Sequence, residues 1–97
     1  MAQFDLYRLA SGQLVVDLQR DPIGIDASRV AAPLRAADRY VAFPGLTPLV
    51  EAEGSQWIVR VQELAAIPGG ELRDRVGSLV EHLDALKRAL DILTDGV

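Results

Sequence analysis

The sequence predicts a mainly β protein of the α+β class, in which an antiparallel sheet is followed by a C-terminal helix. Two observations support this prediction. Up to residue 64, short segments alternate apolar and polar residues between glycine- and proline-containing turns, which is typical of half-buried strands. From residue 72 the apolar residues recur at alternating intervals of four and three, the period of one helical face. Strands that precede a terminal helix favour a sheet covered by that helix.

Length and composition indicate one folded unit. The chain has 97 residues, which predicts a single domain over residues 1–97, and its hydrophobic fraction of 49% is too high for a disordered chain. No apolar run approaches the roughly 20 residues that span a membrane. The first residues also lack the basic start and apolar block of a signal peptide. We therefore expect a cytoplasmic protein without a membrane partner.

The first part of the chain predicts a hairpin and a third strand. Alternating residues at 4–9 and 13–19 predict two strands, and "ASG" at 10–12 predicts the turn between them. Residues 20–26 contain a proline and a glycine and are expected to form a loop. "SRVAAPLR" at 28–35 predicts a strand in which Pro33 indicates an edge position or a bulge.

The middle of the chain predicts a loop and two further strands. Pro44, Gly45 and Pro48 punctuate this stretch, so residues 38–46 are expected to form a loop before a short strand at 47–52. "EGSQW" predicts a turn, and the alternation at 56–64 predicts the clearest strand of the chain. The glycine pair at 69–70 predicts another turn.

The last third predicts a helix with an apolar stripe. The stripe consists of Leu72, Val76, Leu79, Leu83, Leu86, Leu90 and Leu93. Ser78 followed by Glu81 matches a capping box, so we expect the main helix at 79–93 and a separate helical turn at 72–75. Two interpretations of the stripe remain open: it covers the sheet of its own chain, or part of it faces a partner helix in a dimer.

The chain lacks the usual signatures of catalysis and cofactor binding. Its one histidine, His82, falls among charged positions and is expected at the surface, and there is no cysteine to ligate a metal. The serines lack an evident histidine partner, and no nucleotide-binding fingerprint occurs. We expect no enzyme, no cofactor and no metal. A net charge of −4 argues against tight binding of nucleic acid by this chain alone.

Several segments together resemble one family over essentially the whole chain. They are "MAQFDLYRL", "LVVDLQRD", "SRVAAPL", "LTPLVEAEGSQWIVRVQELAAIP" and the closing "ALDILTDGV". The sequence resembles the CcdB family, toxins of plasmid-type toxin–antitoxin pairs that poison bacterial DNA gyrase. The resemblance implies an SH3-like barrel sheet with a C-terminal helix, a fold shared with the MazF ribonuclease toxins. It also implies a homodimer, which agrees with the leucine stripe.

The resemblance further implies a function without catalysis. The dimer is expected to insert its paired C-termini into the gyrase A subunit and to trap the complex with cleaved DNA. A cognate antitoxin is expected to wrap the toxin and to free gyrase. The pair of proteins is expected to repress its own operon, with the antitoxin supplying the DNA-binding domain, so this chain contacts DNA only indirectly.

By the same resemblance, the gyrase-binding residues are a loop position next to Pro22 and the C-terminal tail. They are Ile23, Asp91, Thr94, Asp95, Gly96 and Val97. The best-known family members carry an aromatic residue followed by tryptophan where this chain has Thr94 and Asp95. The acidic tail is either tolerated surface charge or a pair of carboxylates aimed at a basic residue of the target. Gly96 is also a candidate helix C-cap.

Acidic amphipathic antitoxin tails favour an apolar surface that carries arginine. The candidates for antitoxin binding are the 10–12 turn and Arg8, Arg39, Tyr40 and Phe43. The aromatic residues of this loop have a second interpretation, namely local packing. Two alternatives to the gyrase poison stand beside it: a family member that binds antitoxin or a new partner without poisoning gyrase, and an endoribonuclease like MazF. The missing basic cluster argues against the endoribonuclease.

Overall fold

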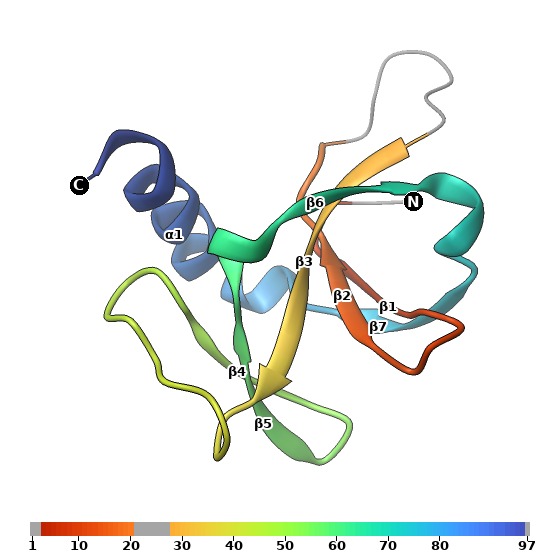
Figure 1. Ribbon diagram of the computed structural model, residues 1–97, viewed down its shortest axis with the longest axis horizontal. Helices are drawn as coiled ribbons and strands as arrows, with labels where there is room; N and C mark the ends of the chain where they lie inside the picture. The colour runs from red at the N-terminus through yellow and green to blue at the C-terminus, as the bar shows by residue number, and fades with distance from the viewer. Residues whose placement is uncertain (1–2, 21–27, 97) are drawn as a thin grey trace.

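The computed structural model describes residues 3–20 and 28–96 of the chain (Figure 1). Its α-helix is α1 (Leu83–Asp95), and three short 3-10 turns are η1 (Val61–Glu63), η2 (Gly69–Glu71) and η3 (Val80–His82). The strands are β1 (Asp5–Arg8), β2 (Leu14–Asp17), β3 (Ser28–Ala36), β4 (Leu49–Ala52), β5 (Ser55–Val59), β6 (Ala65–Pro68) and β7 (Asp74–Ser78). In the described ranges, no helix has the length and apolar character needed to cross a membrane.

The strands form one curled antiparallel sheet around the long strand β3. The order is β4-β5-β3-β2-β1-β7, and β6 also pairs with β3. The first half of β3 pairs with β6 and its last residues pair with β5, so two short strands share one edge of it. Helix α1 lies against the curled sheet (Figure 1). The predicted fold class, mainly β with a C-terminal helix, is confirmed.

Pro33 was predicted to mark an edge position or a bulge, and it lies in the centre of the sheet, so the edge position was wrong. It pairs with Val15 of β2, and its carbonyl accepts the Arg60 N–H at 2.9 Å. Pro33 sits between the part of β3 that pairs with β6 and the part that pairs with β5. A residue without an N–H is tolerated there because neither ladder runs through this position.

Both hairpin turns use residues with positive φ. The predicted turn at 10–12 is confirmed: Gly12 has φ +93° and donates its N–H to the Leu9 carbonyl at 2.8 Å. The second hairpin joins β4 to β5 through Glu53 and Gly54, at φ 51° and 77°. Two successive positive φ angles fit the right-handed twist of the flanking strands. The predicted strand at 47–52 begins at Leu49, and β5 already includes part of the predicted turn.

The predicted strand at 56–64 divides into two strands. β5 ends at Val59, η1 follows, and β6 begins at Ala65, a strand that the sequence did not predict. Val59 pairs with Leu34, whereas Ala65 pairs with Ala31, so the chain leaves β3 and rejoins it three residues earlier. Val61 in the 3-10 turn is fully buried. The apolar alternation therefore continues through the turn, so the sequence pattern does not indicate where the strand ends.

The predicted helix at 79–93 begins later, at Leu83, and the predicted helical turn at 72–75 is wrong because β7 begins at Asp74. The capping box is also wrong: the Ser78 hydroxyl accepts the Val80 N–H at 3.2 Å, and no side chain caps the helix start. Pairing with β1 overrides the helical spacing in this segment. Val76 and Leu79 pack in the main core from outside the helix, and Leu72 packs in a second cluster with Tyr7.

Helix α1 packs on the core of its own chain. Leu86 and Ala89 are fully buried, and Leu83 and Leu90 pack against the same cluster. That cluster also contains one face of β1 and β2, so the helix closes the concave side of the sheet. The interpretation that the stripe covers its own sheet is confirmed for the stripe members Leu83, Leu86 and Leu90. Leu93, at 38% exposure, is left outside.

Candidate functional site

The predicted gyrase-binding tail lies at the end of α1. Asp91, Thr94 and Asp95 are exposed there, at the blue end of the ribbon (Figure 1). Gly96 has φ 76° and donates its N–H to the Ile92 carbonyl at 2.9 Å, which confirms that it caps the helix. The tail residues therefore lie together on an ordered helix end. The other two predicted members, Ile23 and Val97, lie outside the described residues.

The charges of this helix end are unbalanced. Asp91 and Asp95 are one turn apart at the negative end of the helix dipole, and the last turn carries no basic residue. Such a like-charge pair destabilises a helix by about 0.2–0.5 kcal/mol. Neither carboxylate forms an ion pair within the described part of the chain. Both are therefore available to a cation on another molecule.

A turn at residues 43–47 supports the helix end. A Cβ atom placed on Gly45 would lie 2.6 Å from Ile92 Cδ1, so the glycine lets the turn approach α1 closely. Thr47 is buried, and its hydroxyl accepts the Phe43 N–H at 2.8 Å and donates to the Phe43 carbonyl at 3.2 Å. Sequence reasoning used the proline and glycine here only as loop signals and missed this contact.

Two of the predicted antitoxin-binding residues lie together. Arg39 and Tyr40 line a hollow of about 230 Å³, with Arg35 and Trp57 also in its wall. Phe43 is exposed in the next turn and does not line this hollow.

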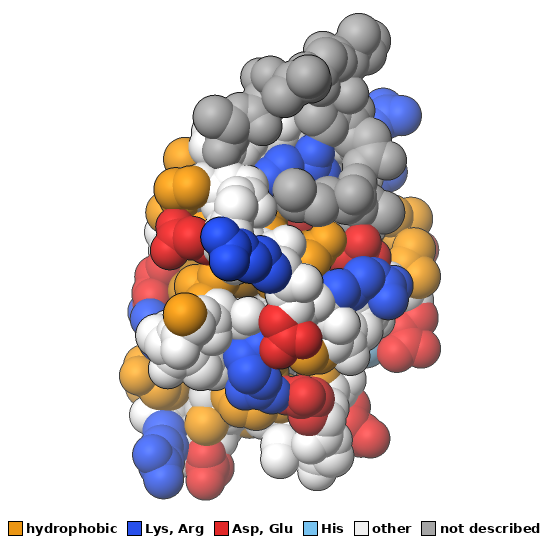
Figure 2. Space-filling model, turned by 90° about the vertical axis from the view of Figure 1, so that its right-hand side faces the viewer, with side chains coloured by type: hydrophobic (Ala, Val, Ile, Leu, Met, Phe, Trp, Pro, Cys, Tyr) orange, Lys and Arg blue, Asp and Glu red, His pale blue; other side chains and the backbone are white. Residues whose placement is uncertain are grey.

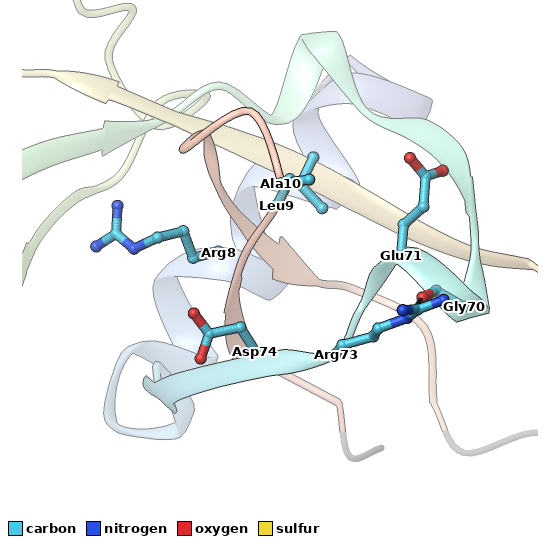
Figure 3. A pocket seen from close by; sticks show the side chains of 7 residues that line it. All are labelled: Arg8, Leu9, Ala10, Gly70, Glu71, Arg73 and Asp74. Carbon is cyan, nitrogen blue, oxygen red and sulfur yellow. Dashed lines mark hydrogen bonds between the residues drawn. The ribbon is translucent and has the colours of Figure 1, made fainter.

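Arg8 lies apart from the other antitoxin candidates and lines a different hollow, of about 410 Å³ (Figure 3). Its guanidinium donates to the Gly12 carbonyl at 3.2 Å and forms an ion pair with Glu53. The rest of this hollow comes from the β1–β2 hairpin and residues 70–74, with Glu71, Arg73 and Asp74 at its margin.

Acidic and basic side chains alternate across the face drawn in Figure 2, without a continuous patch of either sign.

The Tyr40 ring is stacked on two arginines that sequence reasoning missed. The Cζ atoms of Arg35 and Arg60 lie 5.7 and 5.5 Å from the ring centroid. Both guanidinium groups also lie near the Glu63 carboxylate, at 3.2 and 2.8 Å. The two arginines are far apart in sequence and meet because β3 pairs with β5. No local sequence pattern predicts such a contact.

The face of the sheet that points away from α1 buries a polar cluster. Asp17 is completely buried and lies 2.7 Å from the Arg29 guanidinium, which is also buried. Burial raises the pKa of the neighbouring Tyr7 phenol, and the carboxylates of Asp5 and Asp17 raise it further. Loss of either Asp17 or Arg29 would leave the other charge buried without its partner, which would destabilise the fold.

The structure places no metal-binding constellation among residues 3–20 and 28–96. The His82 side chain is partly exposed, at 29%, and its Nε2 atom lies 3.7 Å from a Glu81 carboxylate oxygen. It packs at the start of α1, where the chain passes from η3 into the helix.

The fold is a small curled antiparallel sheet with a C-terminal helix whose end is exposed. The family model described as CcdB protein matches residues 3–96, which is essentially the whole chain. The chain therefore belongs to the CcdB family, whose members are toxins of toxin–antitoxin systems. A comparison with curated proteins gave no match.

Proposed function

We propose that this protein is a non-catalytic toxin that binds the gyrase A subunit through its C-terminal tail and traps the complex with cleaved DNA. The observation that carries the proposal is the family match through the whole helix end, where exposed tail residues sit on an ordered, capped helix. Gyrase acts on DNA in the bacterial cytoplasm, so that is the compartment proposed for the toxin.

The chemistry of the tail favours an electrostatic contact with the target. Thr94 and Asp95 replace the aromatic pair of the best-known members, so stacking is not available at these positions. Asp91 and Asp95 have no cationic partner within the described chain. The proposed partner group on gyrase is therefore an arginine or lysine that enters between the two carboxylates.

The proposal includes a homodimer, because two tails are needed to engage the two halves of the gyrase A dimer. Leu93 supports this: it continues the buried stripe of α1 but is 38% exposed in the single chain. The cognate antitoxin is proposed to bind the surface of Arg39 and Tyr40, with Arg8 and Phe43 as outlying contacts. In the repressor complex, DNA is contacted through the antitoxin alone.

A gyrase cleavage assay tests the proposal. Purified protein is incubated with bacterial gyrase, ATP and supercoiled plasmid, and detergent and protease then reveal trapped double-strand breaks as linear DNA. The native protein is expected to give linear DNA, and a variant that lacks residues 95–97 is expected to give none. Undiminished cleavage by the truncated variant would exclude the tail as the gyrase contact.

An Asp95→Trp variant separates the second candidate function from the first. The absence of the aromatic pair favours, as that second candidate, a family member that binds antitoxin but has lost gyrase. If only Asp95→Trp produces linear DNA, the scaffold is competent and the natural target differs. If neither protein does, the second candidate replaces the first. An RNA-cleavage assay on the same preparation tests the MazF-like endoribonuclease.

A further inference from the structure

Strand β4 forms one end of the sheet and, among the described strands, pairs only with β5. The Val59 N–H donates to the Pro48 carbonyl at 2.9 Å, so from Pro48 onward every second residue bonds to β5, Val50 among them. The backbone N–H and C=O groups of Leu49 and Glu51 therefore point away from the sheet. Within the described part of the chain these groups bond to no other element. β4 thus offers two residues to which a further strand can pair.

The other end strands of the sheet are protected against such pairing. β7, at the opposite end, has a register shift in its pairing with β1 and carries the exposed charges of Asp74 and Arg75. β6, which pairs with β3, ends in Pro68. Bulges, charges and proline all discourage an edge strand from pairing with another chain. β4 keeps a regular register with β5 and contains no proline, so its edge is the more open one.

The side chains beside this edge combine apolar and acidic character. Leu49 is 55% exposed, and Glu51 is exposed and forms no ion pair with any residue described. Because side chains alternate along a strand, Leu49 and Glu51 lie on one face of β4, whereas Val50 enters the core on the other. The edge therefore presents an apolar side chain and a carboxylate two residues apart.

A hollow of about 310 Å³ lies beside the start of β4. It is lined by Gly45, Pro48, Asp84, Ala85 and Arg88. The glycine, the proline and the alanine contribute apolar surface, and helix α1 supplies the charged side chains. Pro48 lies two residues before Val50 and so shares the face that is directed toward α1. A strand added along β4 would bring a side chain to this hollow where it passes Pro48.

We infer that the outer edge of β4 binds an extended segment of another protein as an added antiparallel strand. The segment carries a basic residue opposite Glu51 and an apolar residue opposite Leu49, and its next side chain, opposite Pro48, enters the hollow. Main-chain hydrogen bonds to an edge strand supply affinity, and side chains at alternate positions supply specificity. The inference goes beyond the proposed function, because it uses none of the residues proposed to contact gyrase or the antitoxin.

Charge favours a basic segment over a second copy of this chain. Antiparallel pairing of two β4 edges about Val50 would place Leu49 opposite Glu51 of the copy. The two Glu51 side chains would then be diagonal neighbours, roughly 7–8 Å apart. Each chain also carries a net charge of −4, so the two copies repel each other. A basic segment instead forms an ion pair with Glu51.

Peptide selection tests the chemistry of the partner. A displayed library of random decapeptides is selected in parallel on the immobilised native protein and on a Glu51→Lys variant. Antiparallel pairing predicts the order basic, any residue, apolar, apolar for one family of peptides enriched on the native protein. The Glu51→Lys variant is expected to enrich an acidic residue at the same position of that family. Added salt is expected to weaken binding of the basic family to the native protein.

Nuclear magnetic resonance tests where the peptide lies. A bound peptide is expected to slow hydrogen exchange at the amides of Leu49 and Glu51, whereas the amide of Val50 already bonds to β5 and is expected to change little. Methylation of a peptide amide that faces β4 is expected to weaken binding about tenfold. Methylation of the adjacent amide, which faces away, is expected to leave the affinity unchanged. This comparison needs no change in the protein.

Glu51→Gln is expected to weaken binding of the labelled peptide about fivefold, measured by fluorescence anisotropy. Glu71→Gln is the matched control, because Glu71 is an exposed glutamate away from β4, in no ion pair with the described residues. Its affinity is expected to equal that of the native protein.

Three outcomes would overturn the inference. The first is equal affinity of the native protein and Glu51→Gln. The second is slowed exchange elsewhere but not at Leu49 and Glu51. The third is slowed exchange at these two amides on a rise in protein concentration alone, which would assign the edge to a second copy.

Discussion

Tyr7 shows how a buried side chain acquires unusual chemistry from its position alone. It alternates with Leu6 along β1 and so points to the opposite face of the sheet, where Leu72 covers it. Burial and the carboxylates of Asp5 and Asp17 raise the pKa of its phenol above the usual 10.0, although nearby arginines lower it in part. The folded protein therefore holds this proton more tightly than the unfolded chain does.

A pH titration checks this residue. Because the pKa of Tyr7 is raised in the folded state, its contribution to stability is complete below pH 10.0 and is lost as the pH rises through the folded-state value. The sequence contains two tyrosines, so a Tyr40→Phe variant leaves Tyr7 as the only phenol. Its ultraviolet titration is expected to have a midpoint above 10.0. A midpoint at or below that value would contradict the burial argument.

At the scale of elements, the turn at 43–47 and helix α1 depend on each other. Gly45 combines a positive φ of 78° with a close approach to Ile92, whereas Gly54 has nearly the same φ and open space around its Cα. A side chain at Gly54 would therefore meet backbone strain alone, whereas a side chain at Gly45 would meet the same strain and a clash with Ile92. The helix end that carries the proposed gyrase contact is positioned by this packing as well as by its own cap.

Gly45→Ala is expected to lower the free energy of unfolding by about 2–4 kcal/mol, through strain and overpacking together. Gly54→Ala, the control, is expected to cost about 1 kcal/mol from the backbone alone. Urea denaturation measures both. Combination of Gly45→Ala with Ile92→Ala is expected to cost less than the sum of the single changes, because the smaller side chain removes the conflict. Strict additivity would show that the two residues do not touch in solution.

At the scale of the whole molecule, the leucine stripe has a buried part, which packs on its own chain, and an exposed part at its C-terminal end. Leu83, Leu86 and Leu90 pack in the core of their own chain, whereas Leu93, the next member of the stripe toward the C-terminus, is exposed. A dimer through this end would place two tails side by side, as the proposed function requires. Small domains with few buried residues often gain stability from such an interface.

Sedimentation equilibrium tests the dimer. The native protein is expected at twice the chain mass of 10.5 kDa, and Leu93→Asp is expected to shift the equilibrium toward the monomer by about tenfold or more. Val80→Asp changes a more exposed apolar residue, 60% against 38%, away from the helix end and is expected to remain a dimer. A native protein that is monomeric at high concentration would exclude this interface and weaken the gyrase proposal with it.

The sequence by itself determined the fold class, the first hairpin and the family. Local patterns suffice for these, because alternation, a turn glycine and a terminal helical stripe each depend on neighbours in the chain. The same reasoning placed the tail residues on a helix end and identified Gly96 as its cap. The sequence is sufficient here because the described tail residues and their capping glycine all belong to one helix end.

Where the alternation and the helical spacing were ambiguous, only the tertiary structure decided which element forms. Residues 74–78 have helical spacing but form β7, because pairing with β1 satisfies their backbone groups. The run at 56–64 breaks at η1 so that two short strands share β3, and Pro33 is tolerated at that change of partner. The Arg35–Tyr40–Arg60 stack likewise arises only when β3 meets β5. Contacts between residues distant in the chain leave no local pattern, so only the folded structure reveals them.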